Sequence, residues 1–365
     1  MLYSCNPAAS DRPVGAARRS RQSRSSRKHL TIDIHCHVFT PQADELVKPY
    51  YRPENDAMFT FSSAATREVN RRQMETIAGK LTSVETRLAD MDAMGIDVQA
   101  ISPAPPQYHY WTEPELGREA ARLINHRLAE IVEQHPDRFV AIGTVPLQAP
   151  DLAIEELDRI VQRLGFRGVE IAPHIASMEL SDARLRRFFA RAEELGALVF
   201  IHPQGFSDGQ RLSDHYFINV IGNPLDSTVG VSHLIFGGVL EACPKLKICV
   251  AHGGGYLAAY AGRMDHAWAN RPDCRLHIKR KPTSYLKRLY FDTIVYTPHQ
   301  LEYLVAQYGS DHILMGTDYP YDMGMSDPIG FVASAKRIWR DARDAITGGN
   351  AARLLKLARR KIAAQ

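Results

Sequence analysis

The stretch that decides the fold is TIDIHCHVFTP, residues 31–41, which begins as a β-branched, apolar run and contains His35 and His37. Side chains of a β-strand alternate between its two faces, so these imidazoles point the same way and one metal ion can accept both. Cys36 falls on the opposite face, where we expect a small buried residue. An isolated His-x-His is as often two unrelated histidines at a strand end. The pair therefore predicts a metal site only if other segments supply further ligands.

Seven more short apolar runs follow, separated by longer amphipathic segments. Most are continuous and β-branched or apolar, which is typical of parallel strands covered on both faces. The eight predicted strands are 30–37, 98–103, 139–146, 168–173, 197–203, 247–253, 289–293 and 312–320. Segments 113–135, 151–165 and 181–196 predict helices, and the last begins with a Ser-Asp cap and ends on glycine.

Eight strand–helix repeats over somewhat more than about 250 residues predict an α/β fold, a (β/α)8 TIM barrel. An open doubly wound sheet is the main alternative, but it needs a glycine-rich phosphate turn after the first strand, where this chain has VFTPQADEL. Residues 41–86 interrupt the repeat after strand 1 and predict a rim insertion at the barrel mouth. Segment 204–224 reaches the same rim, as does PPQYHYW (105–111), either as pocket lining or as lid packing.

Composition places the chain among soluble globular proteins. Of its 365 residues, 45% are hydrophobic and 24% charged, and no apolar run approaches the roughly 20 residues that span a bilayer. We therefore expect no membrane partner. The five cysteines are scattered and form no CxxC pair, which predicts reduced thiols and a cytoplasmic protein.

The net charge of +4 is concentrated at the N-terminus. Residues 1–28 hold seven basic side chains against Asp11 alone, a local charge of +6, which leaves −2 for the rest of the chain. Residues 1–28 thus predict a disordered basic tail, with a transit-type peptide as the alternative. Residues 29–365 predict a single barrel domain without a basic surface for nucleic acid.

Metal-competent side chains close several predicted strands. His202 follows the fifth strand, His252 the sixth and Asp318 the eighth. The carboxyl ends of all strands in a barrel share one face, so these side chains are expected to join the His-x-His pair there. One strand-end histidine is usually structural, but five such positions predict a site for Zn²⁺ or a similar divalent ion. His252 can be a fifth ligand or a nearby acid or base.

The His-x-His pair, His202, AHGGG (251–255) and GTDYP (316–320) together resemble the amidohydrolase superfamily. Within it, the sequence is most similar to the branch that contains 2-amino-3-carboxymuconate-6-semialdehyde decarboxylase. RLADMDAMGIDVQAIS (87–102) and DRFVAIGTVPLQAPDLAIEEL (137–157) support the resemblance, which extends from about residue 30 to residue 357.

The resemblance implies one bound divalent ion, Zn²⁺ with Mn²⁺ as the alternative, and a set of residues that act on it. The implied metal ligands are His35, His37, His202 and Asp318, and the implied catalytic residues are His252, which moves protons, and Asp318, which orients or deprotonates a water.

The same resemblance implies a homodimer in which Arg263, within HGGGYLAAYAGR, reaches the neighbouring subunit's active site. A second arginine in the insertion is implied to grip the substrate carboxylate. Arg72 is the preferred candidate and Arg71 the alternative, although either can instead be a solvated surface charge. His174 keeps the position of the family's histidine after the fourth strand and is expected to bind substrate.

The implied activity is metal-dependent, non-oxidative decarboxylation of a small carboxylic acid. Gln204 and Gly205 stand where the reference decarboxylases carry Trp-Asp, so the expected substrate is a related aromatic or ring-opened acid. The alternative is a hydrolase or hydratase of the same superfamily that acts on an amide, lactone or C–C bond. A binuclear hydrolase is disfavoured because strand four offers only Glu170, which lies too deep, and a scaffold protein has no use for five strand-end ligands.

Overall fold

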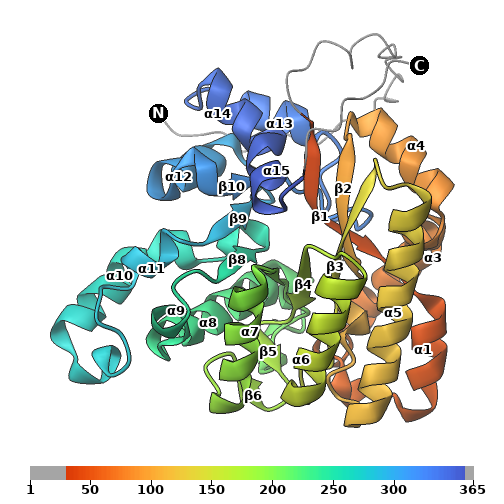
Figure 1. The fold of residues 1–365 in the computed structure, drawn as a ribbon, viewed down its shortest axis with the longest axis horizontal. Coiled ribbons are helices and arrows are strands. Elements are labelled where there is room, and N and C mark those ends of the chain that lie inside the picture. Colours follow the sequence, from red (N-terminus) through yellow and green to blue (C-terminus); the bar gives the residue numbers. More distant parts are fainter. Residues whose placement is uncertain (1–29, 358–365) are drawn as a thin grey trace.

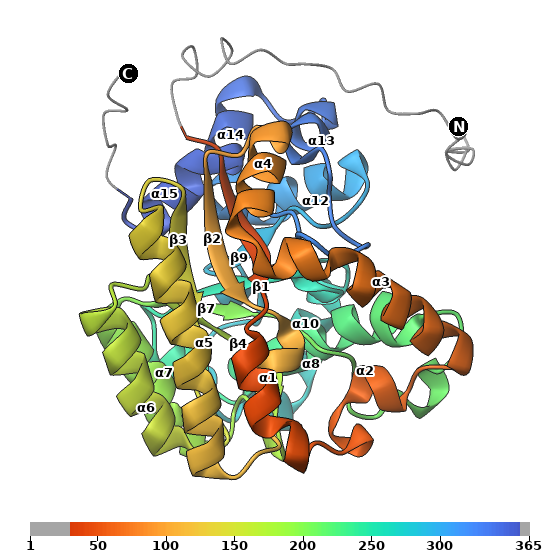
Figure 2. The ribbon, with the colours of Figure 1, turned by 90° about the vertical axis from the view of Figure 1, so that its right-hand side faces the viewer.

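A parallel sheet of eight strands forms the centre of the protein. The computed structural model describes residues 30–357, so the predicted basic tail (1–28) lies outside the described residues. The strand order is β1-β2-β3-β4-β7-β8-β9-β10, and every pair within it is parallel. Helices surround the sheet on its outer side (Figures 1 and 2). The predicted (β/α)8 TIM barrel is confirmed.

All eight predicted strands are present, and several end earlier than expected. The sheet strands are β1 (Ile32–Val38), β2 (Val98–Pro103), β3 (Phe139–Gly143), β4 (Gly168–Ile171), β7 (Leu198–Ile201), β8 (Lys247–Val250), β9 (Tyr290–Asp292) and β10 (Ile313–Leu314). A separate antiparallel ribbon consists of β5 (His174–Ile175) and β6 (Met178–Glu179). The sheet strands stop where the chain turns into the barrel mouth, which a hydrophobic run alone does not reveal.

The helices follow the strands in the expected alternation. They are α1 (Pro41–Val47), α2 (Ala57–Thr60), α3 (Ala64–Thr82), α4 (Val84–Met94), α5 (Pro114–Gln134), α6 (Pro150–Asp158), α7 (Arg186–Leu195), α8 (Asn223–Phe236), α9 (Val239–Ala242), α10 (Leu257–Asn270), α11 (Thr283–Leu286), α12 (Pro298–Tyr308), α13 (Pro328–Ser334), α14 (Arg340–Asp344) and α15 (Asn350–Leu354). Among residues 30–357, no helix is both long and apolar enough to cross a membrane.

The insertion after strand 1 folds as α1, α2 and α3. In Figure 2 these helices run from the end of β1 across one side of the barrel mouth. The backbone N–H of Ser63 donates to the carbonyl oxygen of Ser213 at 2.8 Å, which joins the insertion to the long segment after β7. The two rim segments predicted separately therefore form one continuous wall.

The barrel is closed by main-chain hydrogen bonds between β1 and the segment that follows β10. The N–H of Ile34 donates to the oxygen of Met315 at 2.9 Å, and the N–H of His37 donates to the oxygen of Tyr319 at 2.8 Å. The N–H of Asp318 donates to the oxygen of His35 at 2.8 Å. The first and last strands of the barrel thus bring together the backbone segments that carry three predicted site residues.

Alternation along the strands separates two apolar layers. On β7, Leu198 and Phe200 point into the barrel, whereas Val199 and Ile201 pack against the surrounding helices. Each such side chain, fully buried, contributes roughly 1.5–3 kcal/mol. The inner layer fills the lower barrel and leaves only the mouth for polar chemistry.

A buried arginine links the outer helices to β1. Arg87 on α4 is 2% exposed, and its guanidinium donates to Gln99 Oε1 at 3.1 Å and to the main-chain oxygen of His37. Gln99 Nε2 donates in turn to Asp33 Oδ2 at 3.0 Å, and the Thr317 hydroxyl donates to the same oxygen at 2.6 Å. This network fixes β1 against both of its neighbours.

Replacing Arg87 by methionine should destabilise the fold by roughly 2–4 kcal/mol, because the buried oxygens of Gln99 and His37 each lose a donor. Urea unfolding monitored by circular dichroism measures the loss. Arg184→Met is the control, because Arg184 pairs with Asp182 at the surface, where water and salt screen the interaction, so its free energy of unfolding should stay close to that of the wild type. Equal free energies of unfolding for the two variants would contradict the structural role of the network.

Candidate metal centre

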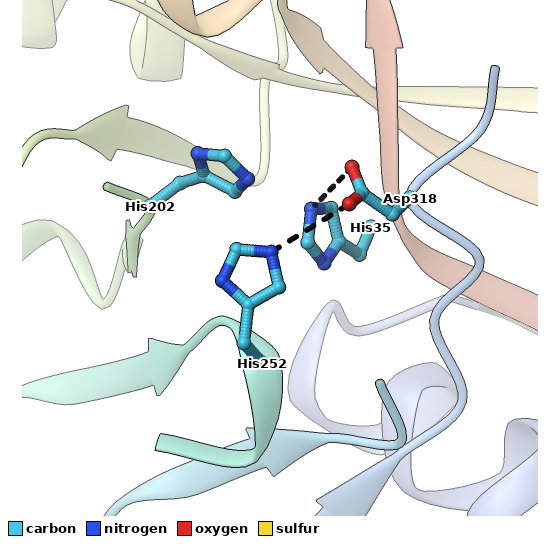
Figure 3. A group of neighbouring side chains, drawn as sticks. All are labelled: His35, His202, His252 and Asp318. Atoms are coloured by element: carbon cyan, nitrogen blue, oxygen red, sulfur yellow. Dashed lines mark ion pairs between the residues drawn. The ribbon is translucent and has the colours of Figure 1, made fainter. Parts of the chain in front are cut away.

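Four of the predicted site residues converge at the barrel mouth. His35 lies on β1, His202 follows β7, His252 follows β8 and Asp318 follows β10. Each offers one ligand atom, and these atoms all lie within 4.8 Å of one another (Figure 3). We call these four residues the metal group. His35, His202 and Asp318 are buried and His252 is nearly so.

His37, the fifth predicted strand-end residue, lies beside the metal group. Its Nε2 is 3.1 Å from Nε2 of His35 and 3.2 Å from Oδ1 of Asp318. The same oxygen of Asp318 is 3.3 Å from Nε2 of His35. Two atoms that bind one ion at 2.0–2.2 Å are about 3.0–3.5 Å apart at angles between octahedral and tetrahedral. These three side chains therefore have the mutual spacing of ligands to a single ion.

Hydrogen bonds behind the β1 histidines set which ring nitrogen faces the centre. Nδ1 of His35 is 2.6 Å from Oδ2 of Asp292, and Nδ1 of His37 is 2.9 Å from the main-chain oxygen of Pro103. Both partners are acceptors, so in a neutral imidazole Nδ1 carries the proton and Nε2 keeps its lone pair. A ligating histidine in a protein usually has this arrangement.

Several polar atoms at the centre lack a protein partner. Both ring nitrogens of His202 and Nδ1 of His252 are buried and make no hydrogen bond within the part of the chain that the structure describes. Buried polar side-chain atoms are satisfied in the large majority of cases, so three orphaned nitrogens in one place indicate a missing partner. A divalent cation is such a partner, and the histidine and carboxylate donors present fit one.

The electrostatics of the centre favour a cation. Burial lowers the pKa of His35, but the carboxylates of Asp318 and Asp292 raise it by more, so its pKa is well above the usual value. Burial, with repulsion from His35 and His37, holds the pKa of His202 well below normal. Burial raises the pKa of Asp318, yet its histidine neighbours outweigh that effect and hold it well below normal. Positive charge is therefore stabilised between the carboxylates.

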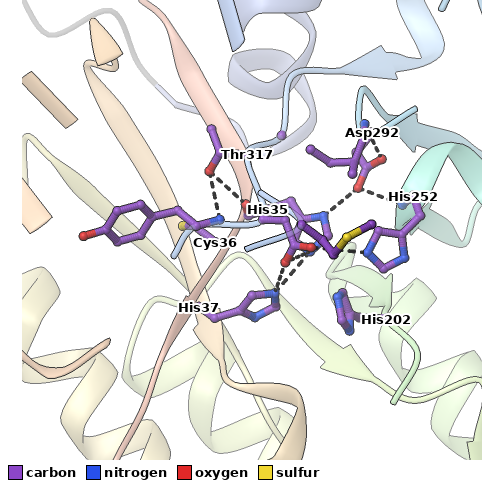
Figure 4. Close-up of polar contacts among 12 residues, drawn as sticks. His35, Cys36, His37, His202, His252, Asp292 and Thr317 are labelled. Atoms are coloured by element: carbon purple, nitrogen blue, oxygen red, sulfur yellow. Dashed lines mark hydrogen bonds and ion pairs between the residues drawn. The ribbon is translucent and has the colours of Figure 1, made fainter. Parts of the chain in front are cut away.

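Asp292, which the sequence analysis did not single out, organises the centre from behind (Figure 4). Besides its contact with His35, its carboxylate accepts the backbone N–H groups of His252 at 3.0 Å and Gly253 at 2.8 Å. One buried side chain thus orients two members of the site on different strands. A signal existed in the sequence, since Asp292 closes the predicted strand 289–293 at the same rim as the histidines.

The HGGG segment is a tight turn and not a phosphate cradle, as its position after a strand-end histidine predicts. His252 has φ 56°, a left-handed conformation that costs a non-glycine residue about 1–2 kcal/mol. Two backbone N–H groups of the segment, those of His252 and Gly253, already donate to Asp292 and are not free to bind a phosphate. A Cβ on Gly255, which has φ 62°, would lie 2.2 Å from the main-chain oxygen of Pro224. The turn therefore needs glycine to bring His252 to the mouth.

A pocket of about 850 Å³ opens at the barrel mouth, among the segments that follow β1, β2, β4 and β7. We call it the rim pocket; its walls come from the insertion (44–61), segment 106–111, the β5 ribbon and the chain after His202. The predicted aromatic segment therefore lines a pocket. The Tyr108 hydroxyl donates to Glu170 Oε1 at 2.8 Å and lies 3.1 Å from the main-chain oxygen of His202. Oε2 of Glu170 is 4.0 Å from Nδ1 of His37, on the side away from the metal group.

The predicted substrate-binding residues occupy different places. His174 lies on β5 and lines the rim pocket. Arg72 is exposed on α3 with its Nε 2.7 Å from Glu68 Oε1, and Arg71 also pairs with Glu68. Arg263 is exposed on α10, which extends away from the barrel in Figure 1. In the described single chain none of the three arginines lines the rim pocket.

Asp292→Asn should weaken metal binding by about 10–100-fold, because an amide no longer accepts the His35 proton as a carboxylate does. Competition between the metal-depleted protein and a chromophoric chelator measures the affinity. Asp311→Asn is the control, because that side chain is 68% exposed and precedes β10, at the end of the strand opposite to Asp318. An unchanged affinity in Asp292→Asn would contradict its positioning role.

Comparison with known proteins shows which family has this arrangement of fold and side chains. The amidohydrolase family model matches residues 32–357. The 2-amino-3-carboxymuconate-6-semialdehyde decarboxylase of Dictyostelium discoideum is 29% identical over 90% of this chain and 92% of its own. Gamma-resorcylate decarboxylase of Rhizobium radiobacter is 29% identical over 65% of this chain and 77% of its own.

The fold comparison agrees with the sequence comparison. The crystal structure of 5-carboxyvanillate decarboxylase from Sphingomonas paucimobilis superimposes with a TM-score of 0.82 at 25% identity, covering 90% of this chain and 99% of that one. The family match spans the whole barrel, including every member of the metal group. The chain therefore belongs to the amidohydrolase family and resembles, within it, the 2-amino-3-carboxymuconate-6-semialdehyde decarboxylases.

Proposed function

We propose that the protein is a metal-dependent decarboxylase that releases CO2 from an aromatic or ring-opened carboxylic acid. The observation that carries the proposal is the convergence of His35, His202, His252 and Asp318 at the mouth of a barrel whose relatives are decarboxylases. Among the described residues, four cysteines are free thiols, which supports a cytoplasmic location for the enzyme.

The proposed metal ligands are His35, His37, His202 and Asp318. Three imidazoles and one carboxylate suit Zn²⁺, with Mn²⁺ as the alternative. When bound, a divalent ion supplies positive charge that stabilises the negative charge developing on the substrate, and it acidifies a bound water. The hydrogen bonds of Asp292 and Pro103 to the β1 histidines support this assignment, since they hold each Nε2 toward the centre.

His252 is the proposed proton donor to the carbon that loses CO2. Its Nε2 lies 3.6 Å from Oδ2 of Asp318, close enough for a proton to pass between them after a small movement. Its side chain is 15% exposed, so it faces the mouth where the substrate enters. Asp292 holds its backbone in place through the N–H groups of the tight turn. Asp318 is proposed to orient or deprotonate the water.

The substrate carboxylate is proposed to be held by arginine supplied in a homodimer. Arg263 on α10 makes no ion pair among the described residues, and its helix extends outward, so a second copy can receive it. His174 is proposed to contact substrate within the rim pocket, where it is half-buried. Arg72 is the proposed second carboxylate ligand; to act there, its pair with Glu68 must open.

A screen for CO2 release tests the proposal directly. The metal-loaded protein should release CO2 from at least one hydroxy- or amino-substituted aromatic or ring-opened acid, measured by trapping of labelled carbonate. Removal of the metal with a chelator should abolish release, and adding back Zn²⁺ or Mn²⁺ should restore it. A hydrolytic product without CO2 from the same panel would overturn the proposal in favour of a hydrolase.

Arg263→Ala should lower kcat/KM by at least about 100-fold, because a charge-assisted contact to the carboxylate is lost. Mixing Arg263→Ala with His252→Ala should restore up to about a quarter of wild-type activity, because half of randomly mixed dimers contain one intact site. Arg271→Ala is the control, since Arg271 lies just past α10 and pairs with Asp273. No recovery on mixing would contradict a contribution across the interface.

A further inference from the structure

The rim pocket has an acidic lining. Its ionisable side chains include five carboxylates but a single lysine, Lys48, and no arginine. Nζ of Lys48 is 3.0 Å from Oε1 of Glu45, so that positive charge is already matched. A second anionic group of a ligand would therefore enter a negative field. Exposed acids alone do not make a binding site. Two buried side chains, Asp226 and His109, indicate whether this pocket binds a charged ligand group.

Asp226 is the first of these side chains. It lies in the first turn of α8, lines the rim pocket and is only 7% exposed, yet its side chain makes no hydrogen bond and no ion pair with any residue of 30–357. Burial, with a contribution from Glu179, raises the pKa of its carboxyl to about 8. A buried carboxyl without a partner is expensive, so its place in a pocket wall indicates a ligand group that pairs with it.

His109 is the second. It is 5% exposed, and both of its ring nitrogens are enclosed without a hydrogen bond to any residue of 30–357. Burial lowers its pKa to about 4, so the imidazole is neutral near pH 7. The carboxylate of Asp44 is 3.7 Å from its Nε2. His109 therefore gives the pocket wall a neutral side chain and no positive charge that would compete for Asp226.

The rim pocket and the metal group share the barrel mouth. Gln204 and Gly205 of the pocket wall follow His202 after Pro203, and Tyr108 of the wall hydrogen-bonds to the carbonyl oxygen of His202. A substrate whose reacting carboxylate sits at the metal group would therefore extend its other end into this pocket. At about 850 Å³ the pocket has room for a substituted ring or an acyclic chain.

We propose that the rim pocket receives the end of the substrate remote from the scissile carboxylate, that it selects a protonated amine there, and that Asp226 is the specificity-determining residue. The inference rests on the proposed decarboxylase function and names the substrate class as an ammonium-bearing carboxylic acid. An ammonium group has three donors and no acceptor, which matches the carboxylate of Asp226. A second carboxylate is excluded by like charge and a neutral hydroxyl gains less from the field.

Calorimetric binding to the metal-loaded full-length protein tests the proposal with three ligands that share one benzoate. The ligands are 4-(aminomethyl)benzoate, the nearly isosteric 4-(hydroxymethyl)benzoate and 4-(carboxymethyl)benzoate. The aminomethyl compound should bind at least about tenfold more tightly than the hydroxymethyl compound, and the carboxymethyl compound should bind most weakly. At pH 7 the binding of the aminomethyl compound should also release up to about one proton, because its ammonium group lowers the pKa of Asp226. The release is measured as a dependence of the binding heat on the ionisation enthalpy of the buffer.

Asp226→Asn should reduce the preference for the amine to within about threefold and abolish the proton release. Glu54→Gln is the matched control: this carboxylate lines the same pocket but is exposed, so the variant should keep both effects. Circular dichroism confirms that both variants are folded.

The outcomes separate this inference from the function on which it rests. Equal affinity for the amine and the hydroxyl, tightest binding of the dicarboxylate, or no binding of any of the three overturns the inference. None of those results would contradict the proposed decarboxylase, because the protein could still release CO2 from another acid. A preference for the amine that depends on Asp226, found in a protein that releases no CO2 from any acid, would support this pocket assignment and overturn the decarboxylase.

Discussion

The structure depends on the closure of the sheet between its first and last strands. Main-chain hydrogen bonds from Ile34, His37 and Asp318 join β1 to the segment after β10. The same contacts set the distance between the β1 imidazoles and the Asp318 carboxylate, because His35, His37 and Asp318 themselves make these main-chain hydrogen bonds. Barrel closure and the assembly of the metal group are therefore one event. A shift of one residue in this register would turn each side chain to the other face.

Buried charge is concentrated around this seam. Asp33 and Asp292 lie below the mouth and accept hydrogen bonds from Thr317 and His35 respectively. Arg87 reaches the same region from the outer layer. Burying these groups without partners would cost several kcal/mol each, so the sequence supplies a partner for nearly every one. Among the described residues, the ring nitrogens of His202 and Nδ1 of His252 are exceptions, and one nitrogen of His202 faces the place where a cation fits.

The sequence predicted the barrel and the residues at its mouth because both follow from short-range rules. Continuous apolar runs mark covered strands, and the direction of parallel strands puts their carboxyl ends together. Asp292 was missed because a single acid near the end of its run, LYFDT, also suits an ordinary strand end. The directions of the side chains on the rim could not be predicted in this way. Whether Arg72 points into the pocket or pairs with Glu68 depends on how α3 is rotated about its axis, and the alternation of strand residues says nothing about that rotation.

Asp226 was out of reach of the sequence for a related reason. It sits on α8, beyond a long segment after His202, and only tertiary packing brings it into the same pocket wall as Tyr108 and His109. Its importance follows from the lack of a partner, which is a property of the folded chain. Positions of this kind determine what a barrel acts on, whereas the strand ends determine what chemistry it performs.

The seam between β1 and β10 also dictates when the centre can exist during biosynthesis. His35 and His37 leave the ribosome before the other side chains of the centre, and Asp318 leaves after them. Until Asp318 has emerged, the nascent chain displays a pair of imidazoles without the carboxylate that lies 3.2–3.3 Å from them in the fold. The complete set of side chains can therefore assemble only after the segment that closes the barrel has been made.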